Sequence, residues 1–352
     1  MKLNKWGSKF LLAPKLDRRL RRILRKGFTL SIAAGVILLL ALASCTQAPK
    51  PPLRVGFVVW PGSESMYLAR DLGYYKNTPI KMLDYPSDAE LMRSYRNGEL
   101  EAITITLDEC LTLAETAPDV RIVTIQDVSN GGDAIIGRPA IKKLQDLKGK
   151  RFGVESPALG AFEISRALEQ AGMTTQDVKI VSLLVSDDER AFKDGSVDAV
   201  VTYEPTVSKL RAIGGNLLWS SKQIPGEVLD VVAMRESAIT QQPEAANALT
   251  TGWFRALDYL QKHPQDAARR MAAHEGLTPE AFLKSLSGVR IPDVEENQKI
   301  LGKTDVAALT ALKRLPNFLL EKGLLKKTVD LTSVFDARLV QDVEVATFKN
   351  KA

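Results

Sequence analysis

The chain has 352 residues, long enough for two domains of ordinary size, and its content of 45% hydrophobic and 6% aromatic residues is typical of a soluble α/β protein. The formal net charge of +6 does not indicate nucleic-acid binding, because residues 1–44 hold ten Lys and Arg residues and a single acid, Asp17. The rest of the chain has 38 basic and 41 acidic residues, which excludes a basic body that binds nucleic acid.

The first 45 residues have the pattern of an export signal. Basic residues at 18–26 precede an apolar run at 28–43, which is shorter than the roughly 20 residues that span a bilayer. The run ends in Leu42-Ala43-Ser44-Cys45, which resembles the lipobox of bacterial lipoproteins and implies a diacylated Cys45. A retained signal anchor is the alternative. We expect residues 1–45 to be a signal peptide and residues 46–52, with three prolines, to be a tether.

The next segment alternates predicted strands and helices. Residues 53–60 are apolar almost throughout, as expected for a parallel strand covered on both faces. A helix follows the Pro61-Gly62 turn and ends at Gly73, and two further strands are predicted at 80–85 and 101–106. Capping boxes at Ser87–Glu90 and Thr106–Glu109 start the helices after the second and third strands, and Gly98 ends the first of these. The segment is therefore a β-α-β-α-β unit.

A second unit repeats the first at an offset of 97 residues. Tyr95–Ala102 matches Phe192–Ala199, and Arg54–Phe57 matches Arg151–Val154. The predicted elements are a strand at 150–155, a helix at 160–170, a strand at 178–185, a helix that starts at the capping box Ser186–Glu189, and a strand at 197–202. Two similar lobes joined edge to edge leave a cleft between them, and open α/β sheets bind ligands at the carboxyl ends of their strands.

The remaining segments connect the lobes and extend the chain. Short apolar strands are predicted at 120–125, 132–137 and 227–233, and the chain is expected to cross between lobes near 131–137 and 227–234. This divides it into lobe one (53–132), lobe two (133–230) and a return to lobe one (231–352). The last part is helical and is expected to pack on lobe one, with helices at 244–262, 264–275, 279–286, 293–300 and 306–322.

Several stretches of the body resemble the substrate-binding lipoproteins of the nitrate, sulfonate and taurine ABC importers, which share the thiamine-pyrimidine-precursor-binding domain. The matching stretches are Trp60–Glu64, Tyr67–Tyr75, Gly132–Ile136, Asp146–Lys150 and Val197–Pro205. The resemblance implies a periplasmic-binding protein type II fold, with two doubly wound α/β lobes, a ligand cleft and a helical C-terminal segment on lobe one.

The resemblance also implies a function. The chain is expected to be an extracytoplasmic, lipid-anchored monomer that faces the periplasm or exterior, captures a small organic or oxyanion solute, and delivers it to an ABC permease and its ATPase. A ligand-sensing lipoprotein is one alternative. A pyrimidine-precursor synthase-like enzyme is another, but the only histidines, His263 and His274, lie in the helical tail. No nucleophile elbow, phosphate loop or His-x-x-x-His metal pair is present, so we predict no catalytic residue, metal or cofactor.

Three kinds of group are expected to line the cleft. Helix starts offer backbone N–H groups to an anion, near Ser63, Asp108, Gly160 and Glu204. Aromatic rings offer stacking surface: Trp60, Phe162 and Tyr203. Hydroxyls set orientation: Ser63, Thr106 and Ser156. Trp60 could instead pack in a hinge, Thr106 could act only as a helix cap, and Glu204 could serve only to start a helix.

The acids around the predicted cleft do not fit an anionic solute. Glu64, Asp133, Glu155 and Glu204 are expected around the cleft or hinge, whereas the cleft loops contain no obvious arginine as a counter-charge. An amine, zwitterionic or neutral heterocyclic ligand therefore stays open, with Trp60 or Tyr203 available for a cation–π contact. The acids could equally be surface residues or helix caps.

Overall fold

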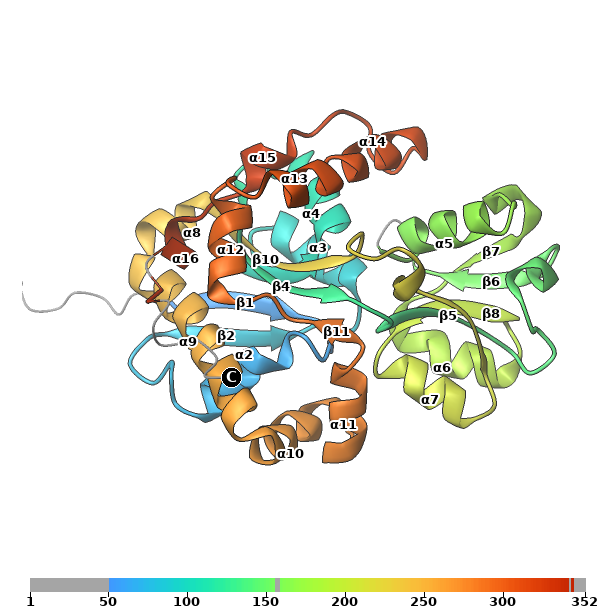
Figure 1. Cartoon of the computed structure of the whole chain (residues 1–352), viewed down its shortest axis with the longest axis horizontal. Coiled ribbons are helices and arrows are strands. Elements are labelled where there is room, and N and C mark those ends of the chain that lie inside the picture. The colour runs from blue at the N-terminus through green and yellow to red at the C-terminus, as the bar shows by residue number, and fades with distance from the viewer. Residues whose placement is uncertain (1–50, 156–158, 342, 345–352) are drawn as a thin grey trace, which may run out of the picture. The chain divides into compact units, whose positions relative to one another are not determined.

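The computed structural model describes residues 51–155, 159–341 and 343–344 (Figure 1). Nearly all described residues belong to one compact unit, which begins at Pro52. The predicted signal peptide, Cys45, residues 46–50 of the tether and Ser156 lie outside the described residues. None of the described helices has the length and apolar character needed to cross a membrane.

Lobe one, as defined here, is a six-stranded sheet with its helices. The strand order is β11-β4-β10-β3-β1-β2, in which β1 is parallel to β2 and β3, and β10 is antiparallel to β3 and β4. Helices lie on both sides of this sheet (Figure 1). Its N-terminal elements are β1 (Leu53–Phe57), α2 (Glu64–Asp71), β2 (Ile80–Asp84), α3 (Asp88–Arg96), β3 (Ala102–Thr106), α4 (Leu107–Ala114) and β4 (Val120–Ser129), and the chain returns as β10 (Leu229–Arg235).

Lobe two is a five-stranded sheet built on the same plan. Its strand order is β7-β6-β8-β5-β9, with β6 parallel to β7 and β8, and β5 antiparallel to β8. Its elements are β5 (Asp133–Gly137), η1 (Leu144–Leu147), β6 (Arg151–Val154), α5 (Leu159–Gln170), η2 (Thr175–Asp177), β7 (Lys179–Ser182), α6 (Val185–Asp194), β8 (Ala199–Tyr203), α7 (Thr206–Ala212), β9 (Asn216–Ser220) and η3 (Ser221–Gln223). In each lobe an antiparallel strand that arrives from the other lobe pairs with the third parallel strand.

The repeated sequence blocks form an ion pair at the same position in each lobe. The backbone N–H of Arg54 donates to Oε2 of Glu101 at 2.8 Å, and its guanidinium contacts the same carboxylate. In lobe two the backbone N–H of Arg151 donates to Oδ2 of Asp198 at 2.9 Å, and its guanidinium contacts that carboxylate. Each pair ties the start of the first parallel strand to the residue just before the third, so the repeated blocks stabilise the scaffold rather than form the site.

The predicted helix ends are confirmed in part. Gly98 and Gly195, equivalent in the two units, have φ of 77° and 80°, the left-handed conformation that favours glycine after a helix. The Ser87 hydroxyl accepts from the backbone N–H of Glu90 at 3.3 Å. The predicted capping box at 186–189 is wrong, because α6 begins at Val185 and no side chain of its own N-cap residue, Leu184, can cap it. The carboxylate of Glu155, from the end of β6, accepts the Val185 N–H instead.

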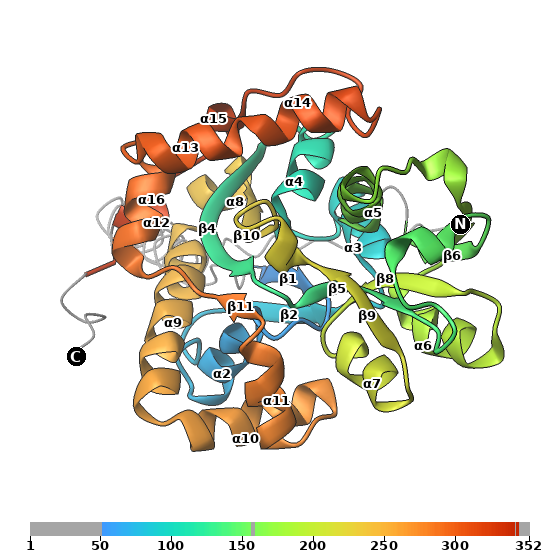
Figure 2. The same cartoon turned by 45° about the vertical axis from the view of Figure 1, so that its right-hand side comes forward.

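Two connections join the lobes (Figure 2), and hydrogen bonds tie one connection to the other. One runs from β4 to β5, and the other from β9 to β10. The strand β10 begins at Leu229, one residue before the predicted end of lobe two at 230. Oγ of Ser129 lies 2.8 Å from Oγ of Ser221, which also accepts from the Gly131 N–H at 2.7 Å. The strand β9 and its turn η3 were not predicted.

The C-terminal segment packs mainly on lobe one, as predicted. Helix α9 lies along α2, and α12 and α16 pack against β4. The predicted helix at 306–322 is two helices that meet at Lys313, and Pro316 lies in the first turn of the second, where its missing N–H is tolerated. The elements are α8 (Glu236–Gln241), α9 (Pro243–Lys262), α10 (Pro264–Glu275), α11 (Pro279–Leu286), β11 (Val289–Arg290), α12 (Val294–Leu301), α13 (Val306–Leu312), α14 (Arg314–Glu321), α15 (Leu331–Val334) and α16 (Arg338–Gln341).

Candidate functional site

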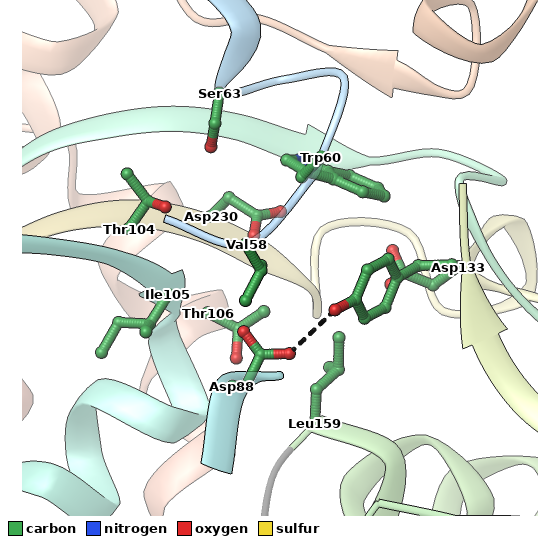
Figure 3. Close-up of a pocket in the computed structure, with 11 residues that line it drawn as sticks. Val58, Trp60, Ser63, Asp88, Thr104, Ile105, Thr106, Asp133, Leu159 and Asp230 are labelled. Atoms are coloured by element: carbon green, nitrogen blue, oxygen red, sulfur yellow. Dashed lines mark hydrogen bonds between the residues drawn. The ribbon is translucent and has the colours of Figure 1, made fainter. Parts of the chain in front are cut away.

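A cavity of about 320 Å³ lies where strand ends of both lobes meet (Figure 3). It is lined by Val58, Trp60, Ser63, Asp88, Thr104, Ile105, Thr106, Asp133, Leu159, Tyr203 and Asp230. A second cavity of about 240 Å³ shares Asp88, Leu159 and Tyr203 with the first and adds Glu155, Gly160, Glu163, Val185, Val201 and Thr202. We call these the first and second cavities.

Two cross-strand pairs at equivalent positions frame the first cavity. In lobe one, Asp230 of β10 pairs with Thr106 of β3, and in lobe two Asp133 of β5 pairs with Tyr203 of β8. The offset of 97 residues relates Thr106 to Tyr203 and also Asp133 to Asp230. Both lobes therefore present an aspartate beside the last residue of their third parallel strand, where open α/β sheets bind ligands.

Trp60 and Tyr203 form the aromatic part of the lining. Their rings meet edge to face at a centroid distance of 5.9 Å and an angle of 88°. The Trp60 indole N–H donates to Oδ2 of Asp127 at 2.9 Å, and the Tyr203 hydroxyl donates to Oδ2 of Asp88 at 3.2 Å, the bond drawn in Figure 3. A Cβ atom on Gly132 would lie 2.5 Å from Cη2 of Trp60, so this glycine allows the ring to pack against the connection between the lobes.

The carboxyl groups of the two cavities hold their protons unusually tightly. Burial, and after it the nearby Glu155 carboxylate, raises the pKa of Asp88 to about 8. Burial raises the pKa of Asp133 to about 7, and the Asp127 carboxylate adds to the effect. Burial likewise raises the pKa values of Glu155, Glu163 and Asp230. No Lys, Arg or His lines either cavity to oppose this effect.

Two glutamates link helix starts of opposite lobes. Glu155 accepts from the Ala89 N–H at the start of α3 at 2.9 Å and from the Val185 N–H at the start of α6 at 3.3 Å. Glu109 accepts from the Thr106 N–H at 3.1 Å and from the Leu159 N–H at the start of α5 at 3.2 Å. These carboxylates occupy the positive ends of helices that could otherwise hold an anion.

The structure places seven of the twelve predicted residues on the cavity linings. Trp60, Ser63, Thr106 and Asp133 line the first cavity, Glu155 and Gly160 line the second, and Tyr203 lines both. Ser156 lies outside the described residues. Four residues expected in the cleft are not part of either lining: Glu64, Asp108, Phe162 and Glu204.

Glu64 belongs to a separate cluster on lobe one. Its Oε1 lies 2.6 Å from Nδ1 of His274, whose Nε2 lies 3.3 Å from Asp84, and the His274 ring stacks on Tyr67 at 4.0 Å. Hydrogen bonds to Asp84 and Glu64 raise the pKa of His274 to about 10. His274 is therefore protonated at neutral pH and balances the buried Glu64 carboxylate, which explains why Glu64 does not line a cavity.

The other three residues also have structural roles. The Phe162 ring packs edge to face on Phe318 of α14 at 5.5 Å, so α14 of the C-terminal segment also contacts lobe two. Glu204 accepts from the backbone N–H of Ser208 at 3.0 Å and thus caps α7. Asp108 is buried in the first turn of α4, and burial raises its pKa to about 6.

Sequence reasoning missed several lining residues. Asp88 and Glu163 come from helices, and only the packing of one lobe on the other brings them to the cavities. Asp230 could have been found, because Asp133-Ala134-Ile135-Ile136 matches Asp230-Val231-Val232-Ala233 at the same offset of 97 residues. The other missed residues are Val58, Leu159 and Val185.

Comparisons with known proteins match this architecture. The sequence profile of the NMT1-like family matches residues 46–275. The taurine-binding periplasmic protein of Escherichia coli (strain K12) is 22% identical over 267 residues, which cover 73% of this chain and 82% of the relative.

Solved structures share the fold. The alkanesulfonate-binding protein SsuA from Xanthomonas axonopodis pv. citri, bound to MOPS, has a TM-score of 0.67 and 18% identity, with 82% of this chain and 98% of that chain covered. The desulfurization enzyme DSZB has a TM-score of 0.61 and 17% identity, with 82% and 98% covered. The predicted α/β fold with two lobes is thereby confirmed.

Proposed function

Since the chain belongs to the NMT1-like family, we propose that it is the solute-binding component of an ABC importer. The observation that carries this proposal is the first cavity, to which strand ends of both lobes contribute equivalent cross-strand pairs. A solute held there contacts both lobes at once, so its binding free energy favours the arrangement in which they are together. The relatives named for taurine and sulfonate binding support the same role.

Binding without chemical turnover fits the lining. Among the residues that line the two cavities there is no Cys, His or Lys, so a thiol or amine nucleophile and the commonest general base are missing. The enzyme DSZB has the same fold, and fold alone does not decide function. The residues that line the cavities therefore favour a binding protein over an enzyme.

The expected location and partners follow from the same role. The chain would be held at a membrane of the cell envelope through a diacylated Cys45, would face the periplasm or exterior as a monomer, and would pass its solute to a permease driven by an ATPase. Intact mass spectrometry of the chain purified from membranes should show a mature N-terminus at Cys45 that carries lipid. Cys45→Ser should abolish that mass shift; a difference between the two proteins equal to the substitution alone would exclude the anchor.

A stabilisation screen tests the proposed function directly. The purified full chain is heated with and without sulfonates, nitrate, amines, pyrimidines and amino acids, and solute NMR follows each mixture. One solute class should raise the unfolding free energy by about 3 kcal/mol at 100-fold excess over its Kd, and the solute should remain unchanged. Conversion of a solute into product, or no stabilisation by any of them, would contradict the proposal.

A further inference from the structure

The two cavities between the lobes are lined by acidic side chains and by no basic side chain. Five carboxyl groups line the two cavities: Asp88, Asp133, Asp230, Glu155 and Glu163. No basic side chain lines them, and no Lys or Arg is buried anywhere in the described ranges. A sulfonate or nitrate would find no Lys or Arg here to balance its charge and would keep these carboxyls protonated, whereas a cation would stabilise them as carboxylates.

Several helix starts, the other usual source of anion affinity, already hold a carboxylate. The N–H groups at the starts of α3, α4, α5 and α6 donate to Glu155 and Glu109, and an N–H in the first turn of α7 donates to Glu204. An oxyanion would have to displace these carboxylates and would leave them buried without a donor. An anion is therefore disfavoured at these five helix starts.

Oxygen atoms without partners show what the cavities lack. Oδ2 of Asp133, Oδ2 of Asp230 and Oγ1 of Thr106 in the first cavity, and Oε1 of Glu163 in the second, are buried and have no hydrogen-bond partner among the described residues. The Asp133, Thr106 and Glu163 side chains are more than nine-tenths buried. Three of the four atoms only accept hydrogen bonds when ionised, so the missing group is a donor.

The aromatic lining suits a cation. Trp60 and Tyr203 present ring surface beside Asp133 and Asp88, while their own N–H and O–H groups are committed to Asp127 and Asp88. A positive group near these rings gains cation–π attraction as well as its contacts with the carboxylates. In the described residues no cluster of His, Cys, Asp and Glu is arranged to hold a metal ion, which favours an organic cation.

We infer that the solute is a small organic amine, bound as its ammonium ion. Its N–H groups donate to Asp133 and Thr106 in the first cavity, and a second ammonium group, where present, reaches Glu163 in the second. This inference rests on the proposed function, because it assigns the charge of the solute bound at the same site.

A matched set of solutes tests whether the site prefers a positively charged solute. Ethylamine, taurine and ethanesulfonate share a two-carbon frame and differ in their end groups, and putrescine adds a second ammonium group. Titration calorimetry with the full chain at pH 7.5 should show saturable binding of ethylamine or putrescine, with an affinity at least about tenfold above that of taurine and of ethanesulfonate, equivalent to about 1.4 kcal/mol. Tighter binding of taurine or ethanesulfonate would overturn the inference and leave the proposed function standing. Binding of none of these solutes would overturn the inference, and the wider screen would then decide the proposed function.

Variants that replace a carboxyl group by an amide test which residues bind the amine. Asp133→Asn and Glu163→Gln keep size and shape but remove a carboxyl group that a bound ammonium ion would hold ionised, so they should weaken amine binding at least about tenfold while leaving the melting temperature equal or higher. Glu275→Gln is the matched control, because Glu275 is also buried, both its carboxyl oxygens lack partners, and it lines neither cavity. It should raise the melting temperature in the same way without changing affinity. Unchanged affinity in both cavity variants would overturn the inference.

Discussion

Replacing Trp60 with alanine is expected to abolish solute binding and to lower the free energy of unfolding by about 3–5 kcal/mol. The side chain is 5% exposed, its indole N–H satisfies the buried Asp127 carboxylate, and its ring supplies the aromatic lining beside Tyr203. Removing it opens the connection at Gly132 and leaves Asp127 without that donor. Urea unfolding measures the stability, and titration calorimetry with the tightest-binding solute of the panel measures the affinity.

Trp219 provides the control for this prediction. It is 1% exposed and donates its indole N–H to Gln170 at 2.9 Å, so Trp219→Ala should cost comparable stability. It lines neither cavity, and its substitution should therefore leave the affinity of the folded protein within about threefold of the wild type. Trp60→Phe, which keeps a ring, offers a better-folded second variant and should still weaken binding about tenfold. Wild-type affinity in Trp60→Ala would remove Trp60 from the site.

The unliganded protein is expected to lose stability as the pH rises from 5 to 8. A carboxyl whose pKa is higher in the folded than in the unfolded state binds more protons when folded, so its contribution falls between those two values. Asp88 has a folded pKa of about 8, and Asp133 and Asp127 have values of about 7, against 3.8 for an unperturbed aspartate. His274 acts in the same direction above pH 6.5, because its folded pKa is about 10.

The expected loss between pH 5 and pH 8 is at least about 3 kcal/mol, given that one pKa unit corresponds to about 1.4 kcal/mol. Acids with lowered pKa, such as Asp84 and Asp266, lose their contribution only below about pH 4 and do not affect this window. Urea unfolding at several pH values measures the slope, and the double variant Asp88→Asn/Asp133→Asn should flatten it. Stability that stays constant or rises over the same range would show that these carboxyls are not held together between the lobes.

The sequence pattern predicted the frame of the fold because that frame depends on local signals. Apolar runs, glycine helix stops and the repeat at 97 residues identified both β-α-β-α-β units and the helical C-terminal segment. The strand β9 was missed, since Asn216–Ser220 is short, follows two glycines and is apolar only at its centre. The start of α6 was misplaced because the carboxylate of Glu155, the residue after β6, caps it, and no local rule reports a cap from a distant part of the chain.

In the candidate site, too, the sequence located the residues that depend on local signals and missed those that depend on packing between distant parts of the chain. Trp60, Thr106 and Tyr203 follow or end parallel strands, so the rule that ligands bind at strand ends located them. Asp88 and Glu163 lie on helices, and their role depends on how one lobe packs on the other. Glu64 was assigned to the cleft because sequence does not reveal that His274, 210 residues away, lies within hydrogen-bond distance.

The crystal structure of the full chain with the tightest-binding amine of the panel tests the central claim most directly. We expect the amine in the first cavity beside Trp60 and Tyr203, with its nitrogen within hydrogen-bond distance of Asp133 and Thr106 and with both lobes in contact with it. An amine bound elsewhere on the molecule, or first and second cavities filled by an anion in its place, would contradict the account.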